Sequence, residues 1–215
     1  MSLILDLIFP KKCYGCGQTG DYICLECQKN INVLNNKPPQ NGFDGGLSLF
    51  KYHSFIKSAI TDLKYQFVSD NTTDLANLCV KTLKSKFPNL IKYWRQNNFI
   101  LIPIPLHQSR QNWRGFNQSE ILSQKIASKL SLDFSNQILI RCQNTAVQAR
   151  FKNIKDRKNN VANIFSLSPV LGKFKHKNFI LFDDVCTTKS TLISAQKTLK
   201  ISSPNQCWYL TLSAG

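Results

Sequence analysis

Short apolar runs alternate with helical patterns along most of this chain. Residues 47–52, 99–102, 137–141, 179–182 and 207–212 have the composition of buried strands. Between them, apolar residues at spacings of three and four predict helices near 54–63, 70–87, 89–96, 119–130 and 191–200. This alternation, with strands that are apolar throughout, predicts an α/β fold built on a mostly parallel sheet flanked by helices.

The first 46 residues follow a different pattern. Residues 1–36 contain a short apolar segment, expected to form a helix, and a cysteine-rich stretch with almost no core of its own. Residues 37–46 are rich in Pro and Gly, which predicts a linker. We therefore expect a small N-terminal module at 1–36, a linker at 37–46 and a main domain at 47–215.

The segment 179–191 carries the most specific chemistry. Its apolar strand leads into Asp183 and Asp184, then a hydroxyl-rich turn, then the start of a helix. Ligands of α/β proteins bind at the carboxyl ends of parallel strands, and a helix N-terminus attracts phosphate. Carboxylates suit sugar hydroxyls or Mg²⁺, so the segment predicts a sugar-phosphate site. The alternative is a solvent-exposed strand-to-helix turn with an acidic cap.

Two basic segments offer further ligand-binding groups. The first ends the strand at 99–102 and leads into Pro103, Ile104, Pro105, Arg110, Trp113, Arg114 and Gly115. The second is polar and irregular, suits a flexible hood over an anionic ligand, and contains Arg141, Thr145, Gln148, Arg150 and Arg157. Guanidinium groups bind phosphate with two parallel hydrogen bonds. Each arginine could equally be an ordinary surface charge, and Trp113 could stack on a base or pack into the core.

Four of the eight cysteines form a metal-binding pattern. Cys13 and Cys16 make one C-x2-C pair, and Cys24 and Cys27 make a second one seven residues later. Four thiolates at this spacing predict a closed, tetrahedral and therefore structural Zn²⁺ site, with redox-active thiols as the alternative. Cys79, Cys142, Cys186 and Cys207 lie in apolar surroundings and are expected to be buried.

The net charge of +16 favours anionic partners such as nucleic acid or phosphorylated small molecules. The alternative is a lysine excess that reflects an AT-rich genome, since the basic residues are scattered. No run approaches the roughly 20 apolar residues of a transmembrane helix, and the N-terminal segment lacks the features of a signal peptide. We expect a cytoplasmic protein, with a peripheral contact at the inner face of the membrane as an open alternative.

The segment 179–191 resembles the 5-phosphoribosyl-1-pyrophosphate (PRPP) signature of type I phosphoribosyltransferases. The resemblance implies that Asp183 and Asp184 bind the ribose hydroxyls. It implies that the turn that follows wraps the 5′-phosphate, with Val185, Cys186, Thr187, Thr188, Lys189, Ser190 and Thr191 around it. Lys189 departs from the signature, which has Gly there. A positive φ at this position would cost a lysine about 1 kcal/mol, and its amine could instead contact the phosphate.

The chain as a whole is similar to the ComF/ComFC competence family. The resemblance rests on the paired C-x2-C motifs, Ile-Pro-Ile-Pro with Arg-Gly-Phe-Asn-Gln-Ser, the polar segment after residue 141 and the Asp-Asp-Val-x-Thr-Thr turn. It implies a zinc module followed by a phosphoribosyltransferase-like domain. It also implies a pyrophosphate loop at 103–115 and a flexible hood at 141–160.

The family resemblance implies DNA uptake in natural transformation, with single-stranded DNA as partner and contacts to other uptake proteins at the inner membrane. On this interpretation the protein binds single-stranded DNA and retains a PRPP pocket. The alternative is an active Mg²⁺-dependent phosphoribosyltransferase in which Asp183 and Asp184 are catalytic and the acceptor is unidentified.

Overall fold

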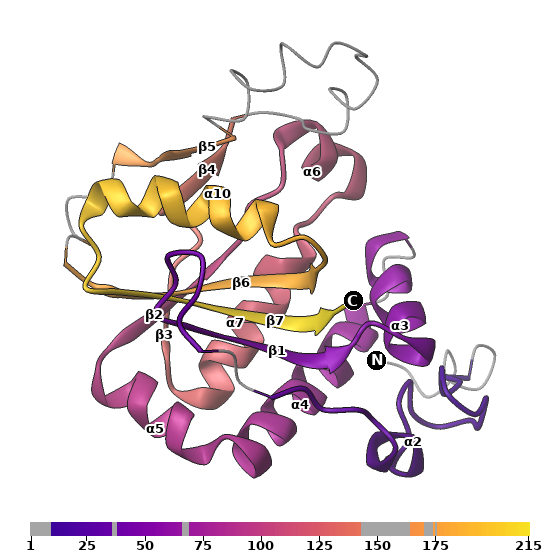
Figure 1. Ribbon diagram of the computed structural model, residues 1–215. Coiled ribbons are helices and arrows are strands. Elements are labelled where there is room, and N and C mark those ends of the chain that lie inside the picture. Colours follow the sequence, from indigo (N-terminus) through magenta and orange to yellow (C-terminus); the bar gives the residue numbers. More distant parts are fainter. Residues whose placement is uncertain (1–9, 36–37, 66–68, 143–163, 170–173, 175) are drawn as a thin grey trace.

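Five parallel strands form the centre of the molecule (Figure 1). The computed structural model describes residues 10–35, 38–65, 69–142, 164–169, 174 and 176–215. In the described part the strand order is β1-β7-β6-β2-β3, with bounds β1 Gly45–Lys51, β7 Gln206–Ala214, β6 Asn178–Cys186, β2 Phe99–Pro103 and β3 Asp133–Phe134. The predicted α/β class with a mostly parallel sheet flanked by helices is confirmed.

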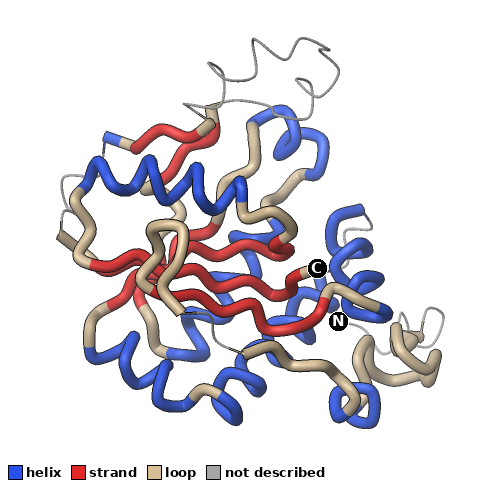
Figure 2. Tube along the Cα trace, viewed as in Figure 1, coloured by secondary structure: helices blue, strands red, loops and turns tan. Residues whose placement is uncertain are grey.

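Helices cover both faces of the sheet (Figure 2). The helices α3 Ser54–Tyr65, α4 Ser69–Lys86, α5 Pro88–Gln96 and α7 Gln118–Leu130 pack on one face, and α10 Ser190–Leu199 packs on the other. Alternate residues of β6 divide between the two cores, because successive strand side chains point to opposite faces. Ile180 and Phe182 join the larger core, whereas Phe179 and Leu181 join the core beneath α10.

Several elements differ from the predicted pattern. β6 continues through Asp183 and Asp184 to Cys186, so the acid pair lies inside a strand and not after it. The segment 108–114, expected as a loop, forms the short helix α6 Gln108–Arg114. The strand expected at 137–141 is β4 Leu139–Arg141, which pairs antiparallel with β5 Phe165–Leu167 outside the main sheet. A single 3-10 turn, η3 Lys200–Ser202, follows α10.

The N-terminal module lies against the edge of the sheet at β1. It contains the short helix α2 Leu25–Lys29, and the chain then runs antiparallel beside β1. Leu34 donates its backbone N–H to the Leu49 carbonyl at 2.8 Å, and Lys51 donates to the Asn32 carbonyl at 3.3 Å. The first two residues of β1 belong to the range 37–46 that the sequence predicts as a linker. The division of the chain into domains stays a prediction.

Within the described residues, no helix is long and apolar enough to span a bilayer.

Candidate functional site

The acid pair lies at the carboxyl end of the central strand β6. β2 pairs with β6 only as far as Phe182, and Ile104 then donates its backbone N–H to the Phe182 carbonyl at 2.8 Å. β6 therefore extends past the end of β2, and Asp183 and Asp184 reach beyond their neighbour on that side. Asp184 is 5% exposed and Asp183 is partly exposed. This is the sheet edge where α/β proteins bind ligands.

The start of α7 holds both carboxyl groups. Asn117 caps this helix by accepting the Ser119 backbone N–H at 3.1 Å, which turns the next two side chains toward β6. Ser119 Oγ donates to Asp183 Oδ1 at 3.1 Å, and Gln118 Nε2 reaches Asp184 Oδ2 at the long distance of 3.5 Å. Arg114 Nη1 donates to Gln118 Oε1 at 3.2 Å, so a polar chain links Arg114 to the acid pair.

Gln118 and Ser119 contact the acid pair of the candidate site, and the sequence prediction missed them. They stand in the Arg-Gly-Phe-Asn-Gln-Ser motif that supported the family resemblance, and the motif was the only signal available. Their roles depend on the packing of α7 against β6, which a linear pattern does not specify.

Asp183 is an unusual carboxyl group because it is hard to ionise. Burial raises its pKa first, and the adjacent Asp184 carboxylate raises it further, to about 8. The hydrogen bond from Ser119 opposes this shift only partly. At neutral pH Asp183 therefore retains its proton, so this carboxyl group can donate a hydrogen bond as well as accept one.

The hydroxyl-rich turn closes one side of the site. Asp183 and residues 185–192 line a common hollow at the start of α10, where Thr187, Thr188 and Ser190 are exposed. Thr188 and Ser190 hydroxyls lie 2.9 Å apart. Backbone N–H groups at a helix start, together with these hydroxyls, suit a phosphate. Cys186, by contrast, is 4% exposed, and burial raises the pKa of its thiol.

Lys189 adopts the left-handed backbone conformation that glycine favours. Its φ is +58°, so the turn keeps the positive φ despite the side chain. The Lys189 ammonium lies 5.0 Å from the centre of the Tyr209 ring, on the core side of α10. A cation over an aromatic face is worth about 0.5–2 kcal/mol, which offsets much of the backbone cost of roughly 1–2 kcal/mol.

The predicted pyrophosphate loop becomes the end of β2 and the helix α6. Pro103 is the last residue of β2, Ile104 is buried and Pro105 is partly buried. Gly115 ends α6 with a φ of 77°. Trp113 is 67% exposed, which excludes the core position and leaves its ring accessible.

One arginine lies near the acid pair, and a second lies near that arginine. Burial lowers the pKa of Arg141 at the end of β4, the like charge of Arg110 on α6 lowers it further, and the negative charge of Asp183 opposes both effects. Arg141 therefore lies within electrostatic reach of both Arg110 and Asp183, although the three residues come from three separate elements. The other predicted hood residues, Thr145, Gln148, Arg150 and Arg157, lie outside the described residues.

The cysteine cluster forms a second candidate site. The Sγ atoms of Cys13, Cys16, Cys24 and Cys27 all lie within 4.8 Å of one another, and those of Cys16 and Cys24 are 3.6 Å apart. A tetrahedral zinc with Zn–S bonds of about 2.3 Å would set sulfur atoms near 3.8 Å apart. The backbone N–H groups of Gly15 and Cys24 each lie 3.4 Å from Cys13 Sγ, where they stabilise a thiolate. The cluster could therefore hold a metal such as zinc.

The remaining cysteines follow the prediction with one exception. Cys79, Cys186 and Cys207 are buried, as expected. Cys142 is exposed, and its thiol lies 3.0 Å from the Ser166 hydroxyl, so the prediction of burial was wrong there. It stands one residue past the end of β4, at the edge of the described residues.

Comparisons with known proteins cover most of the chain. No family model matches it. It is 32% identical to "Competence protein F" of Haemophilus influenzae, over 86% of this chain and 78% of that protein. It is 36% identical to "DNA utilization protein YhgH" of Shigella flexneri, over 84% and 74%, and 28% identical to "Competence protein ComFC" of Bacillus subtilis, over 71% and 56%.

Among solved structures, adenine phosphoribosyltransferase of Leishmania tarentolae matches 62% of this chain and 71% of that chain, with a TM-score of 0.35 and 15% identity. A likeness this distant supports no argument about function. The sequence relatives, by contrast, share the greater part of both chains. The chain belongs to the ComF/ComFC family of competence proteins.

Proposed function

We propose that this protein handles single-stranded DNA during DNA uptake and binds a phosphoribosyl ligand, such as PRPP, beside Asp183 and Asp184. The names of the relatives support the DNA role, since they are competence and DNA utilization proteins. The net charge of +16 supports it too, because the DNA backbone is a polyanion. The zinc module is proposed to be structural.

One observation carries the ligand proposal: the acid pair and the hydroxyl-rich turn meet at one end of β6, with Arg141 within electrostatic reach of Asp183. A ribose 5-phosphate has a diol at one end and a phosphate at the other. Two adjacent carboxyl groups, one of which can also donate a hydrogen bond, suit the diol, and the turn at the start of α10 suits the phosphate. Arg110 and Arg141 suit a pyrophosphate at C1. The acid pair would hold a Mg²⁺ ion, which would offset the charge of the pyrophosphate.

The acid pair makes a testable distinction between ribose and deoxyribose. A ligand without the 2′-hydroxyl leaves one buried carboxyl group unpaired, and such mismatches cost several orders of magnitude where the site is closed. We expect calorimetry to give at least tenfold weaker binding of 2-deoxyribose 5-phosphate than of ribose 5-phosphate. Equal affinities would mean that the site recognises only the phosphate.

The DNA role is tested by salt dependence. A fluorescein-labelled oligothymidylate is titrated with the zinc-loaded protein at a series of salt concentrations. Because lysine and arginine contacts release counterions, we expect the affinity to fall steeply as salt rises. Weak binding even at low salt would refute the DNA role and leave the phosphoribosyl pocket as a separate question.

Catalysis is a second candidate function, favoured by the position of Arg141 beside Asp183 and of Arg110 beside Arg141. Arginines there would stabilise the charge on a departing pyrophosphate. In the simplest reaction, a water oxygen bonds to C1 of PRPP as the C1–O bond to pyrophosphate breaks, and one proton of that water passes to the solvent, giving ribose 5-phosphate and pyrophosphate. Release of pyrophosphate that needs Mg²⁺ and is lost in Asp184→Asn would establish an enzyme. No release by the wild-type protein would leave a binding pocket.

A further inference from the structure

Three adjacent hollows follow one another across α2, α4 and α5, on the opposite face of the sheet from α10. The first lies between the cysteine module and α4, the second lies along α4 and α7, and the third lies along α5. The first and second share Lys81 and Ser85, and the second and third share Lys84. Through these shared residues the three hollows form one track. Figure 1 shows the helices α5, α4 and α2 along the lower edge of the molecule.

All the charged side chains that line this track are positive. The cationic residues that line it are Lys29, Lys81, Lys84, Lys86, Lys92, Arg95 and Lys129. No acidic residue lines any of the three hollows, as far as the chain is described. The nearest acidic contact is Glu26, whose carboxylate lies 2.7 Å from the Lys29 ammonium.

Helical spacing produces the alignment. Asn77, Lys81, Lys84 and Ser85 stand at intervals of three and four on α4 and so share one face. Lys92 and Arg95 do the same on α5. The opposite side of α4 is apolar and buried against the sheet, so this basic face can only point to solvent. The track is thus part of the packing of the fold and not a scatter of loop lysines.

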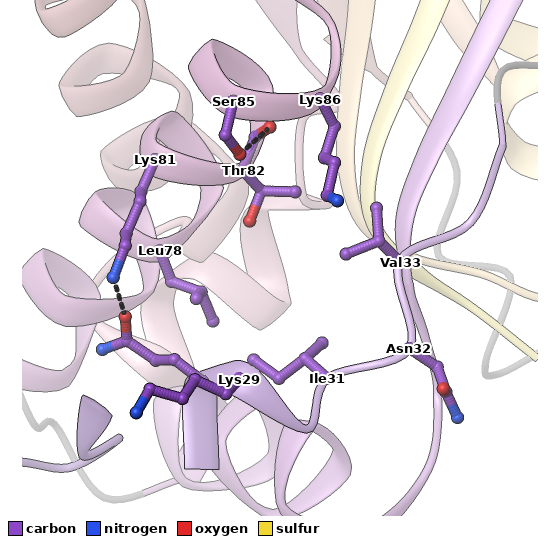
Figure 3. A pocket seen from close by; sticks show the side chains of 10 residues that line it. Lys29, Ile31, Asn32, Val33, Leu78, Lys81, Thr82, Ser85 and Lys86 are labelled. Atoms are coloured by element: carbon purple, nitrogen blue, oxygen red, sulfur yellow. Dashed lines mark hydrogen bonds between the residues drawn. The ribbon is translucent and has the colours of Figure 1, made fainter. Parts of the chain in front are cut away.

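The first hollow combines this charge with an apolar floor. Figure 3 shows Ile31, Val33 and Leu78 pointing toward one another, with the Lys86 amine above them. The Lys81 ammonium donates to Gln28 Oε1 at 2.9 Å, which ties the cysteine module to α4 at the rim. The hollow has a volume of 430 Å³, within the range of about 300–1,000 Å³ for small-molecule sites. An apolar floor under a cationic rim fits an unpaired base and its phosphate.

We propose that this track, lined on α4 and α5 by Lys84, Lys86 and Lys92, binds the backbone of single-stranded nucleic acid, with an unpaired base in the hollow beside Leu78. The proposal rests on the DNA-handling function and adds where the strand lies. Lys129 follows Ser119 by ten residues on α7, so the track is roughly 15 Å from the acid pair along that helix. Strand binding and ligand binding then use different surfaces.

A membrane surface is the competing occupant for a basic face. Peripheral membrane contacts usually add exposed apolar side chains that enter the bilayer. The large hydrophobic residues exposed in the described part are Leu25, Trp113, Ile140 and Ile201, and none of them lines a hollow of the track. The observations therefore favour nucleic acid.

The test compares two variants of equal charge. Lys84→Gln/Lys86→Gln/Lys92→Gln removes three cations from the track, and Lys177→Gln/Lys197→Gln/Lys200→Gln removes three exposed lysines elsewhere. Both lower the net charge from +16 by three. With a labelled oligothymidylate, we expect the track variant to bind at least tenfold more weakly than the control variant. The slope of log affinity against log salt should be shallower by about 2 in the track variant, because each of the three lost phosphate contacts accounts for about 0.7 of the slope.

Other outcomes overturn the proposal. Equal weakening in both variants would assign the effect to net charge alone, and unchanged binding in the track variant would exclude this surface. If the wild-type protein binds the oligonucleotide but the track variant matches it, the DNA role stands and only the track fails. If the wild-type protein does not bind, both fail. If the track variant loses binding to phosphatidylglycerol vesicles but still binds DNA as the wild-type protein does, the track would be assigned to a membrane.

Lysine footprinting gives a direct map that does not depend on affinity. The wild-type protein is acetylated briefly with and without the oligonucleotide, and each lysine is scored by mass spectrometry. We expect protection of Lys84, Lys86 and Lys92 and no protection of Lys177 and Lys197. The reverse pattern would overturn the proposal.

A competition experiment tests the unpaired base in the first hollow. If a duplex of the same sequence competes with the single strand equally well, no unpaired base binds there.

Discussion

Lys189 changes the sequence of the turn without changing its backbone conformation. From the sequence alone, a lysine in place of glycine left two readings open, a strained turn or a new phosphate contact. The residue has the positive φ, and its ammonium lies over the Tyr209 ring. The position of the side chain depended on β7, which is distant in sequence, so the pattern could not predict it.

Removal of the Lys189 amine should therefore leave ligand binding nearly intact. We expect Lys189→Gly to change the calorimetric affinity for PRPP with Mg²⁺ by less than about threefold, because the amine rests on Tyr209 and the backbone keeps its shape. A loss of tenfold or more would mean that the amine contacts the phosphate. Lys197→Gly on α10 provides a charge-matched control.

Asp183 should make the stability of the protein fall as pH rises. Its pKa is raised to about 8 in the folded state, above the value of about 3.9 in an unfolded chain, so the folded state retains a proton that the unfolded state loses. The stabilising contribution is complete below about pH 4 and is lost progressively toward pH 8 and above.

The matching variant is Asp183→Asn, which cannot ionise. We expect its melting temperature to exceed that of the wild-type protein at pH 8, by about 2–4 °C per kcal/mol of relieved repulsion, and the difference to shrink at pH 5. Asp133→Asn, at an exposed position, should track the wild-type curve. Parallel curves for wild type and Asp183→Asn would contradict the raised pKa.

Gly15 matters to the cysteine cluster because no larger side chain fits at this position, and not because glycine makes the backbone flexible. A Cβ atom there would lie 2.5 Å from Cys27 Sγ, where a metal-bound thiolate must sit. We expect Gly15→Ala to weaken zinc binding at least tenfold, measured by competition with a chromogenic chelator. Gly17→Asn is the control, because nothing lies near Gly17 and Asn tolerates its φ of 76°. Equal zinc affinity in both variants would contradict this role.

At the scale of elements, the centre of the sheet was the most predictable part. The run 179–182 is apolar throughout, and it forms the middle of β6 between two other strands. The start of β1 was missed because Gly45 and Gly46 have the composition of a linker. They are needed in the strand, since a Cβ atom on Gly46 would overlap the Tyr209 ring and one on Gly45 would lie 2.5 Å from the Trp208 ring. Only the tertiary structure provides that reason.

The position of α7 should matter for ligand binding through Ser119. Its hydroxyl donates to Asp183 Oδ1, and a hydrogen bond to a neutral carboxyl group contributes about 0.5–1.5 kcal/mol. We expect Ser119→Ala to lower PRPP affinity by roughly three- to tenfold while oligothymidylate affinity stays unchanged. Ser128→Ala, on the exposed side of the same helix, should leave both affinities unchanged. A parallel loss of both would indicate general damage to the fold.

For the whole molecule, the composition predicted anionic partners, and the structure offers two separate surfaces where such partners could bind. The acid pair and the turn lie at the carboxyl end of the sheet within reach of Arg141, whereas the lysine track follows α4 and α5. The cysteine pairs and the Asp-Asp turn could be recognised because their residues are close in sequence. The lysine track could not, because its members come from four helices.

The most direct test of the central claim is a calorimetric titration of PRPP with Mg²⁺ into the wild-type protein and into Asp183→Asn/Asp184→Asn. We predict saturable binding of one PRPP per chain in the wild type and loss of at least a hundredfold in affinity in the double variant, with the protein still folded. Equal affinity in the two proteins, or no binding to the wild type, would contradict a phosphoribosyl site at the end of β6.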